Sequence, residues 1–465
     1  MKRTIFRGLY LRVDLSKIDF SAPVRSHYCT NPQDLAWARK QIHAYIKEGV
    51  LAPSLSQDHL VHPWFVIRKK GKRRLVIDFD RLNQAILHSP SVSYEDLSQA
   101  PSLIRRRPWM VSIDLKSAFH HIPLSPSLIR LSCIRLDHQV FAFQVLSFGL
   151  NMAPKIFCSI LQAALDHLRL DPIRPLKLIF YMDDILLASP TRRFARADAL
   201  LLISHLLSLG FVINFDKSVI YPTRLIQHLG LLINTYDYSF RIPPHKLSDL
   251  TSFCQTVAIR PQIRLLTARS LLGKLLALRL AFSPVRRFTW NLIQEISIAI
   301  PPTRLLRSQQ RHLRISLSTL ARSDLFWIAN NLASFPPSRF LSRPSVHVFT
   351  DASNTGWGAW VPRLNLGVHG KWTITQLPPI HCLELAAVIH ACSALPLPPH
   401  SRIALHTDNT AIIAYLRRWG GSGSPQLQSL VHNLWDILLA KSLSIHTVTY
   451  ISTTDNWQAD RLSRL

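Results

Sequence analysis

Two adjacent aspartates lie between two strongly apolar segments, and this arrangement limits the possible folds more than any other feature of the sequence. Residues 176–180 (LKLIF) and 185–189 (ILLAS) have the pattern of buried strands, and only the four residues YMDD separate them. Because no glycine intervenes, the two segments predict a tight hairpin that projects Asp183 and Asp184 from a buried sheet. Burial of two carboxylates without a partner raises their pKa, so the hairpin needs a counter-charge.

Asp114 is the natural third member of an acidic cluster. It ends another predicted strand, WMVSID (109–114), in the same apolar context, and it could face the aspartate pair across a sheet. Two Mg²⁺ ions about 3.5–4 Å apart would neutralise such a cluster and organise an in-line phosphoryl transfer. For the aspartate pair taken alone, a solvated hairpin is the alternative interpretation.

Acidic residues are scarce in this chain. The 465 residues include 55 Lys and Arg against 27 Asp and Glu, with a net charge of +28. This excess favours nucleic acid as a partner, because each cation placed on a phosphate releases condensed counterions. A hydrophobic content of 48% excludes a disordered basic tail and allows two or three domains with large cores.

The cysteines and the hydropathy pattern exclude further classes. Six scattered cysteines without a C-x-x-C pair argue against a zinc module and a disulfide framework, and predict a reducing, intracellular location, cytoplasmic or nuclear. No segment reaches 18 uncharged apolar residues, so we expect neither a signal peptide nor a membrane span.

Three further segments have a recognisable organisation. Residues 35–50 have helical spacing, and residues 61–79 predict a hairpin whose RKKGKRR tip, taken alone, is typical of a solvated turn. Residues 241–345 contain helical runs, with 16 Lys and Arg against three acids. This segment predicts phosphate contacts, with Arg286 and Arg287 as candidates, while a solvated helical linker is the alternative.

The C-terminal segment from Val346 predicts strands alternating with helices and a second acidic cluster. Asp351 and Asp408 each end a predicted strand, Glu384 lies within a predicted helix, and Asp460 begins the closing helix. In a βαβ arrangement, strand ends and an adjoining helix face can converge on a two-metal site. A helix cap is the alternative for Asp408.

Six ordered motifs over residues 30–240 resemble those of a retroelement reverse transcriptase: LVIDFDRLN, SIDLKSAF, LSFGLNMAPKIF, YMDD, LGFVINFDKS and HLGLLI. The resemblance implies a right-hand polymerase of α/β class with an α+β palm. It also implies that Asp114, Asp183 and Asp184 hold two metal ions.

The same resemblance implies roles for residues around the acids. Phe119 would stack under the sugar and exclude a 2′-hydroxyl, and Arg74 would grip the triphosphate, helped by Lys72 or Lys70. Singly, Phe119 could be a core aromatic and Arg74 a surface cation. His120 and His121, predicted to follow Phe119 in a strand, are interpreted as structural. The other implied contacts are Gly149 (backbone approach, or a turn glycine), Lys217 (nucleotide phosphates), Leu229 and Gly230 (primer grip), and Tyr181 and Met182.

The C-terminal motifs TDAS, LEL, HTDN and ADRLSR resemble a retroelement ribonuclease H, whose four acids they match. The family usually has a histidine where this chain has Tyr450, and His446 lies roughly 13 Å away along a strand. The ribonuclease is therefore expected to be slow. The implied domains are an N-terminal extension (1–34), fingers and palm (35–240), a basic helical thumb and connection (241–345) and ribonuclease H (346–465).

Overall, the motifs are most similar to those of DIRS-type retrotransposon polymerases. Hepadnaviral polymerases, which share YMDD, TGWG and the IH-x-x-EL segment, are the alternative lineage. The resemblance implies an RNA-directed DNA polymerase with ribonuclease H activity, using Mg²⁺ (two ions per site) or Mn²⁺. Its partners would be an RNA template, a DNA primer, an RNA–DNA hybrid and dNTPs, with a tyrosine recombinase or capsid-like protein of the same element, and no membrane.

Two alternatives remain open. One is a domesticated copy that binds nucleic acid without catalysis. The presence of all seven carboxylates counts against this alternative. The other concerns the chain itself, which is either a free-standing or processed product or a fragment of a polyprotein.

Overall fold

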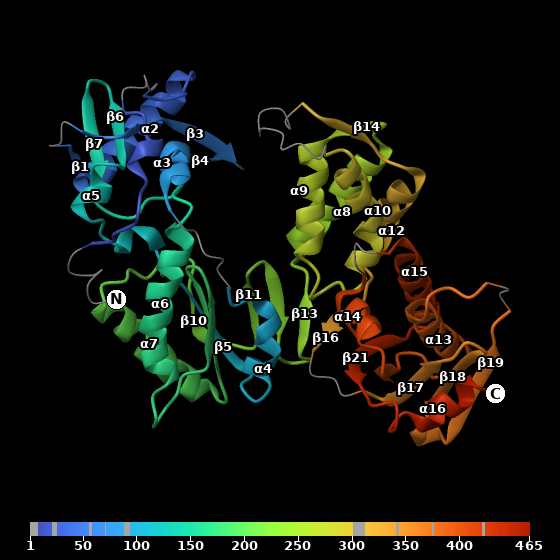
Figure 1. Cartoon of the computed structure of the whole chain (residues 1–465). Coiled ribbons are helices and arrows are strands. Elements are labelled where there is room, and N and C mark those ends of the chain that lie inside the picture. Colours follow the sequence, from blue (N-terminus) through green and yellow to red (C-terminus); the bar gives the residue numbers. More distant parts are fainter. Residues whose placement is uncertain are drawn as a thin grey trace. The chain divides into compact units, whose positions relative to one another are not determined.

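The computed structural model describes residues 8–20, 26–54, 58–69, 71–87, 94–300, 312–340, 344–373, 376–420 and 424–465. The chain divides into two compact units, Met1–Leu229 and Gly230–Leu465 (Figure 1). In the described residues, no helix combines the length and the apolar character that a membrane crossing requires. Lys70 lies outside the described residues.

The first unit begins with a capped helix and a basic hairpin. Helix α2 (Pro32–Lys47) starts where the Asn31 side chain accepts hydrogen bonds from the N–H groups of Gln33 and Asp34. Strands β3 (Trp64–Lys69) and β4 (Lys72–Ile77) pair in an antiparallel hairpin. The predicted helix and the predicted hairpin are both confirmed, although the helix starts and ends three residues earlier than its pattern.

A four-stranded antiparallel sheet carries the first acidic cluster. Its order is β10 (Val219–Thr223), β5 (Trp109–Asp114), β9 (Asp184–Ser189) and β8 (Leu178–Tyr181). Helices α6 (Ala153–Arg169) and α7 (Arg192–Ser208) contribute apolar side chains to the same core as the sheet. The two central strands, β5 and β9, are buried along nearly their whole length, which explains their continuous apolar sequence.

A second small sheet and several short elements complete this unit. The sheet has the order β1 (Leu51–Pro53), β7 (Gln139–Phe143), β6 (Cys133–Leu136) and β2 (Val61–His62). The short elements are η1 (Leu15–Lys17), α3 (Asp80–Ala85), η2 (Leu97–Gln99), α4 (Ala100–Ile104), η3 (Ala118–His121), α5 (Pro126–Ile129) and β11 (Leu225–His228).

The strand predicted for His120 and His121 is wrong. Both residues belong to η3, which follows Ser117. Ser117 has a left-handed φ of 50°, so the chain turns directly after β5 instead of continuing as a strand.

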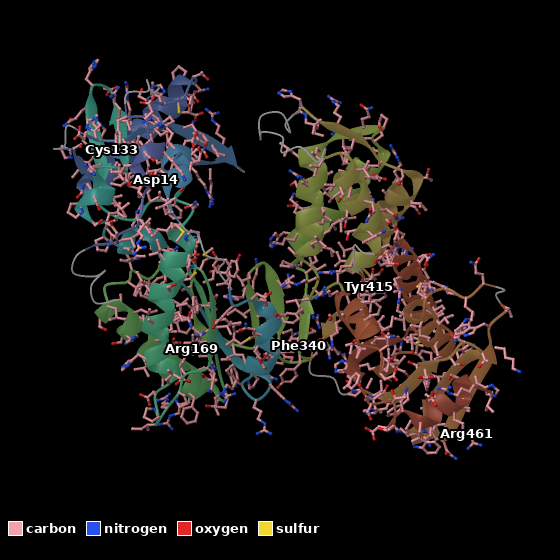
Figure 2. The ribbon with its side chains drawn as sticks, viewed as in Figure 1. Asp14, Cys133, Arg169, Phe340, Tyr415 and Arg461 are labelled. Carbon is pink, nitrogen blue, oxygen red and sulfur yellow. The ribbon has the colours of Figure 1, made fainter. Side chains whose placement is uncertain are left out.

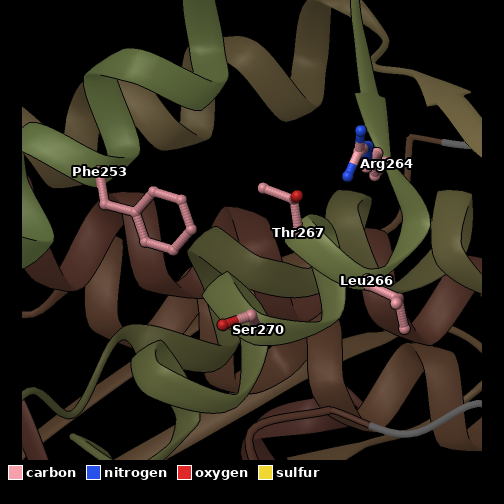
Figure 3. Close-up of a pocket in the computed structure, with 5 residues that line it drawn as sticks. All are labelled: Phe253, Arg264, Leu266, Thr267 and Ser270. Carbon is pink, nitrogen blue, oxygen red and sulfur yellow. The ribbon is translucent and has the colours of Figure 1, made fainter. Parts of the chain in front are cut away.

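The second unit begins with helices and short strands. The helices are α8 (Pro244–Ile259), α9 (Leu265–Leu276), α10 (Val285–Ile298) and α12 (Thr319–Asn331), which confirms the helical pattern of this basic segment. The strands are β12 (Leu231–Asn234), β13 (Ser239–Arg241) and β16 (Ser338–Arg339), and the pair β14 (Gln262–Arg264) and β15 (Arg314–Ser316). A pocket of about 510 Å³ lies beside α8 and the start of α9, lined by Phe253, Arg264, Leu266, Thr267 and Ser270 (Figure 3).

A five-stranded mixed sheet occupies the end of the chain. Its order is β19 (Leu366–Lys371), β18 (Gly356–Val361), β17 (Val346–Ala352), β20 (Arg402–Thr407) and β21 (Ser444–Tyr450). β17, β20 and β21 are parallel, as the predicted βαβ arrangement requires. The remaining elements are η4 (Pro362–Leu364), α13 (Ile380–Ala394), α14 (Thr410–Arg418), α15 (Pro425–Ala440) and α16 (Trp457–Ser463).

Candidate functional site

Three aspartates meet at one end of the first unit's antiparallel sheet. Asp114, the last residue of β5, lies directly opposite Asp184, the first residue of β9. Met182 and Asp183 form the two-residue turn between β8 and β9, where Met182 has a φ of 55°. The Leu115 N–H donates to the Asp183 carbonyl at 3.0 Å, which fixes this turn beside the end of β5. Strand pairing thus brings together the three acids, as the sequence predicts.

The electrostatics of this cluster favour a bound cation. Burial and the neighbouring charges of Asp183 and Asp114 raise the pKa of Asp184 to about 6. Burial, with a contribution from Asp114, also raises the pKa of Asp183. The Lys217 ammonium lies 3.7 Å from Asp114 Oδ1, but its side chain is 69% exposed, so water screens much of its charge.

Two polar side chains that the sequence analysis did not single out hold Asp114 in place. Asn214 Nδ2 donates to Asp114 Oδ1 at 2.7 Å, and the Asp114 N–H donates to Ser218 Oγ at 3.0 Å. Ser218 Oγ in turn donates to the Asn214 carbonyl at 2.7 Å. Both residues lie in the LGFVINFDKS motif, and a polar Asn in an otherwise apolar run was the available signal.

The basic hairpin separates its cations by face. Arg73 donates through Nε to Asp34 Oδ1 at 2.9 Å, and Arg68 binds the same carboxylate at 2.8 Å. Lys72 and Arg74 alternate with Arg73 along β4, are exposed, and form no ion pair with any described residue. The hairpin therefore leaves Lys72 and Arg74 available for an anionic ligand.

Phe119 lies in an aromatic group that is partly open to solvent. Its ring centroid is 4.7 Å from that of Phe148, which is 50% exposed, and 5.8 Å from that of the fully buried Phe157. Tyr181 is partly exposed, and Met182 Sδ lies 3.7 Å from Cys158 Sγ. Phe119 therefore rests on the core while one side of its aromatic group faces solvent.

Gly149 has a structural requirement for glycine. Its φ is 107°, and a Cβ there would lie 2.7 Å from the Ile77 carbonyl oxygen. The Gly149 carbonyl also accepts from Asn83 Nδ2 at 2.9 Å. Leu229 and Gly230 have left-handed φ values of 44° and 83°. Backbone conformation and packing thus explain why position 149 is a glycine without invoking a ligand. This agrees with the alternative that Gly149 is a turn glycine.

A second acidic cluster lies in the C-terminal sheet. One carboxylate oxygen from each of Asp351, Glu384 and Asp408 lies within 4.8 Å of the others, and in the described part of the chain only this group of three potential metal ligands approaches so closely. Burial, with the charges of Asp351 and Asp408, raises the pKa of Glu384 to about 9. Burial likewise raises the pKa of Asp351 to about 6.

The fourth acid, Asp460, reaches this region through close packing of α16 on β18. A Cβ on Gly358 would lie 2.5 Å from the Ala459 carbonyl oxygen and 2.5 Å from the Ser463 nitrogen. Asp460 binds Arg464 at 2.7 Å instead of joining the group of three. Ser463 Oγ donates to Asp351 Oδ2 at 2.8 Å, so α16 also positions Asp351.

Asp408 is not the helix cap considered as its alternative. The side chain of Asn409 caps α14 by accepting from the N–H groups of Ala411 and Ile412. Asp408 Oδ2 accepts instead from Thr453 Oγ1 at 2.7 Å. Its carboxylate is therefore directed away from the helix and toward the cluster.

Tyr450 ends β21 close to the second cluster. It pairs with Thr407, the residue before Asp408, and is 56% exposed. His446 lies on the same strand at a register irregularity, and burial lowers its pKa. Tyr450 therefore pairs with the residue that precedes Asp408, whereas His446 lies four residues away along the strand.

The residues of both clusters fit divalent cations. Glu384 Oε2 is buried and forms no hydrogen bond in the described structure, and one oxygen of the Glu384 carboxylate lies within 4.8 Å of those of Asp351 and Asp408. Hard oxygen donors of this kind are the ligands that Mg²⁺ and Mn²⁺ prefer.

Comparisons with known proteins agree with the motif analysis. Residues 67–233 match the family described as reverse transcriptase (RNA-dependent DNA polymerase). The enzymatic polyprotein of Figwort mosaic virus is 25% identical over 343 residues, covering 70% of this chain and 46% of that protein. The Pol polyprotein from transposon opus of Drosophila melanogaster is 24% identical, covering 74% of this chain and 34% of that protein.

A hepadnaviral protein is also similar to part of the chain. Protein P of Duck hepatitis B virus is 28% identical over 172 residues, covering 36% of this chain and 20% of that protein. This chain therefore spans less than half the length of each of these curated relatives.

Solved structures confirm the predicted fold. A foamy viral protease-reverse transcriptase in complex with double-stranded DNA matches with a TM-score of 0.60 and 17% identity, covering 96% of this chain and 74% of that chain. The same type of protein with an RNA/DNA hybrid matches with a TM-score of 0.58 and 16% identity, covering 95% and 56%. The chain has a right-hand polymerase fold, and its residues 67–233 are similar to the reverse transcriptase family.

Proposed function

We propose that this chain is an RNA-directed DNA polymerase that also carries a ribonuclease H, copying element RNA into DNA and removing the RNA strand. The observation that carries the proposal is the meeting of Asp114, Asp183 and Asp184 at one sheet end within the reverse transcriptase domain. The competing proposal, a non-catalytic nucleic-acid-binding copy, does not account for acids kept at a cost in stability.

Asp114, Asp183 and Asp184 would hold two Mg²⁺ ions, for which Mn²⁺ could substitute. When bound, these ions supply charge stabilisation of the attacking and leaving oxygens of phosphoryl transfer. Asn214 and Ser218 keep Asp114 oriented, and Lys217 adds a positive charge beside it. No catalytic imidazole is required when metal ions stabilise the reacting oxygens. The histidines near Phe119 belong to η3 and pack against neighbouring rings, which fits a structural role.

We further propose that the incoming dNTP lies between the basic hairpin and the acids. Arg74 and Lys72 would bind its phosphates, because Arg73 and Arg68 are engaged by Asp34 and these two are not. Phe119 would lie under the sugar and exclude a 2′-hydroxyl. Lys217 would contact phosphates, Tyr181, Met182 and Gly149 would border the nucleotide, and Leu229 and Gly230 would contact the primer.

The ribonuclease H proposal rests on the C-terminal acids. Asp351, Glu384, Asp408 and Asp460 would hold the metal ions of this second site, and the unpaired Glu384 Oε2 supports that role. Ser463 and Thr453 orient Asp351 and Asp408. Tyr450 stands beside Asp408 where an imidazole would carry protons more readily at neutral pH.

The remaining expectations stay proposals as well. One is the division of the chain at residues 34, 240 and 345 into an N-terminal extension, fingers and palm, thumb and connection, and ribonuclease H. Another is the origin in a DIRS-type element, with a tyrosine recombinase or a capsid-like protein as partner. A hepadnavirus-like polymerase remains the alternative lineage, and Protein P of Duck hepatitis B virus supports it. An intracellular location, cytoplasmic or nuclear, fits the six free cysteines.

Primer extension on RNA and DNA templates, with and without Mg²⁺, tests the polymerase. Release of labelled fragments from the RNA strand of a hybrid tests the ribonuclease H. We expect both activities to require the metal ion. A protein that binds the hybrid but performs neither reaction would establish the non-catalytic alternative.

A further inference from the structure

An ion pair occupies the outer edge of strand β8, where a further strand would otherwise pair. β8 is the last strand of its sheet, and its inner edge pairs with β9. At the outer edge, the Phe180 N–H donates to Glu95 Oε2 at 2.8 Å, and the Leu178 carbonyl accepts from Arg169 Nη2 at 3.0 Å. The two side chains thus supply one acceptor and one donor, as a neighbouring strand would.

The two side chains also bind each other. Arg169 Nη2 donates to Glu95 Oε2 at 2.7 Å, with 17% and 25% of the side chains exposed. Arg169, labelled in Figure 2, ends helix α6, and its guanidinium lies 5.3 Å from the centre of the Phe180 ring. A charge-assisted bond in so shielded a place is stronger than an exposed ion pair.

The residue before Glu95 contacts the next position of the strand. The rings of Tyr94 and Tyr181 lie 5.7 Å apart. Residues 94–95 therefore hold two consecutive residues of β8, immediately before the turn that carries Met182 and Asp183. An edge strand that loses such partners opens more readily, and the turn at its end moves with it.

We propose that Glu95 and Arg169 are positioning residues for the acidic hairpin, acting through the backbone of β8 and not by touching substrate. The inference rests on the proposed polymerase function of that hairpin. A displacement of about 1 Å in a reacting group can cost about 100-fold in rate. Loss of this edge support should therefore slow nucleotide addition without weakening the binding of primer and template.

Four variants of the full chain test the proposal in single-turnover primer extension: Glu95→Ala, Glu95→Gln, Arg169→Ala and the double variant Glu95→Ala, Arg169→Ala. Glu95→Ala should slow nucleotide addition by roughly 10- to 100-fold, with an unchanged Kd for primer–template. The rate of Glu95→Gln should lie between those of the parent and Glu95→Ala. Its amide oxygen still accepts from the Phe180 N–H, but the side chain lacks the charge that binds Arg169. The double variant Glu95→Ala, Arg169→Ala should be no slower than the slower single variant, since both act through one strand.

Asp198→Ala is the matched control for a purely structural effect. Asp198 pairs with Arg174 and accepts from Ser189 Oγ at 2.6 Å, at the far end of β9, roughly 17 Å along the strand from Asp184. This variant should lower the thermal midpoint yet add nucleotides at the parent rate below that midpoint. Equal slowing of Asp198→Ala and Glu95→Ala would overturn the positioning role.

Amide hydrogen exchange of residues 178–184 gives a readout that does not depend on activity. Glu95→Ala should raise exchange there by at least tenfold, while Asp198→Ala should not. Parent-like exchange and parent-like nucleotide addition in Glu95→Ala would each contradict the proposal. A parent protein that extends no primer at all would overturn the proposed function instead. The two failures are distinguishable because the parent protein is assayed before any variant.

Discussion

Asp114 and Asp184 are direct cross-strand partners in the antiparallel pair of β5 and β9. Like charges in this position destabilise a sheet, and burial adds to the cost. The chain nevertheless places Asp183 in the adjoining turn and surrounds Asp114 with Asn214 and Ser218. Such an arrangement stores unfavourable charge at one point of a well-packed sheet, which is the physical signature of a cation site.

The second acidic cluster predicts a dependence of stability on pH. The pKa of Glu384 is raised to about 9, far above its ordinary value, so the folded protein holds a proton there that the unfolded chain has released. Folding stability should therefore be lost as pH rises from about 5 toward 9 in metal-free buffer. Thermal unfolding across that range measures the effect, and Mg²⁺ should restore stability at the alkaline end.

Glu384→Gln tests the same charge directly. Glutamine does not ionise, so the variant avoids the cost of protonating this carboxyl on folding, which should raise the metal-free midpoint at pH 8 by about 2–8 °C and flatten its pH dependence. Asp455→Asn, at an exposed acid outside the cluster, should leave both unchanged. A parent-like pH dependence in Glu384→Gln would mean that burial does not raise the pKa of this carboxyl.

Binding to an RNA–DNA hybrid should depend steeply on salt. With many phosphate contacts, affinity should fall by about 10³ or more between 50 and 200 mM salt, with little sequence preference. Filter binding or fluorescence anisotropy over this range gives the slope. Salt-insensitive binding, or strong discrimination among unrelated hybrids, would indicate a different kind of interface.

The structure changes which cations should be tested for this slope. Arg287, a sequence candidate for phosphate contact, binds Asp324 at 3.2 Å and Asp436 at 3.4 Å, and its side chain is 16% exposed, so we expect it to contribute less to phosphate binding than an exposed arginine. Arg286 is exposed, and Arg264 lines the pocket of Figure 3. Arg264→Ala and Arg286→Ala should each reduce the salt slope by about one, whereas Arg287→Ala should lower stability without altering it.

Phe119→Val should relax discrimination between dNTP and rNTP. A smaller side chain removes the proposed clash with a 2′-hydroxyl, so we expect the ratio of incorporation efficiencies to change by roughly tenfold or more. Phe157→Leu, in the buried part of the same aromatic group, should lower stability and leave the ratio unchanged. An unaltered ratio in Phe119→Val would assign Phe119 to the core alone.

Tyr450→His should raise steady-state cleavage of the RNA strand. An imidazole with a pKa near 6.5 exchanges protons at neutral pH, whereas a phenol near 10 does not. The gain should shrink in a single-turnover experiment that excludes product release, and polymerisation should not change. Equal steady-state rates for the two proteins, with Asp351→Asn confirming the source of cleavage, would show that Tyr450 only ends its strand.

The sequence predicted those parts of the fold that rest on local pattern. The YMDD hairpin and the strand ending in Asp114 follow from apolar runs, and their pairing was expected because a two-metal site requires the three acids to lie close together. The strand predicted for His120 and His121 failed because Ser117 adopts a left-handed conformation that no neighbouring residue signals. The engagement of Arg287 by two acids could not be predicted, since it depends on helices far apart in sequence.

The partners of the side chains that support the acidic cluster could not be predicted from the sequence either. Asn214 reaches Asp114 across 100 residues, and Glu95 reaches Phe180 across 85. Neither spacing repeats, and although a polar Asn214 in an otherwise apolar run is a signal, it does not indicate Asp114 as the partner. Only the folded chain shows that these side chains hold the hairpin and the adjoining strand.

The most direct measurement of the central claim is primer extension by Asp183→Asn. The substitution removes a carboxylate ligand with almost no change in volume, so the fold and the binding of template should survive. The account predicts that Mg²⁺-dependent DNA synthesis is abolished while the Kd for primer–template stays at the parent value. Extension at even a tenth of the parent rate would contradict the assignment of Asp114, Asp183 and Asp184 as the polymerase site.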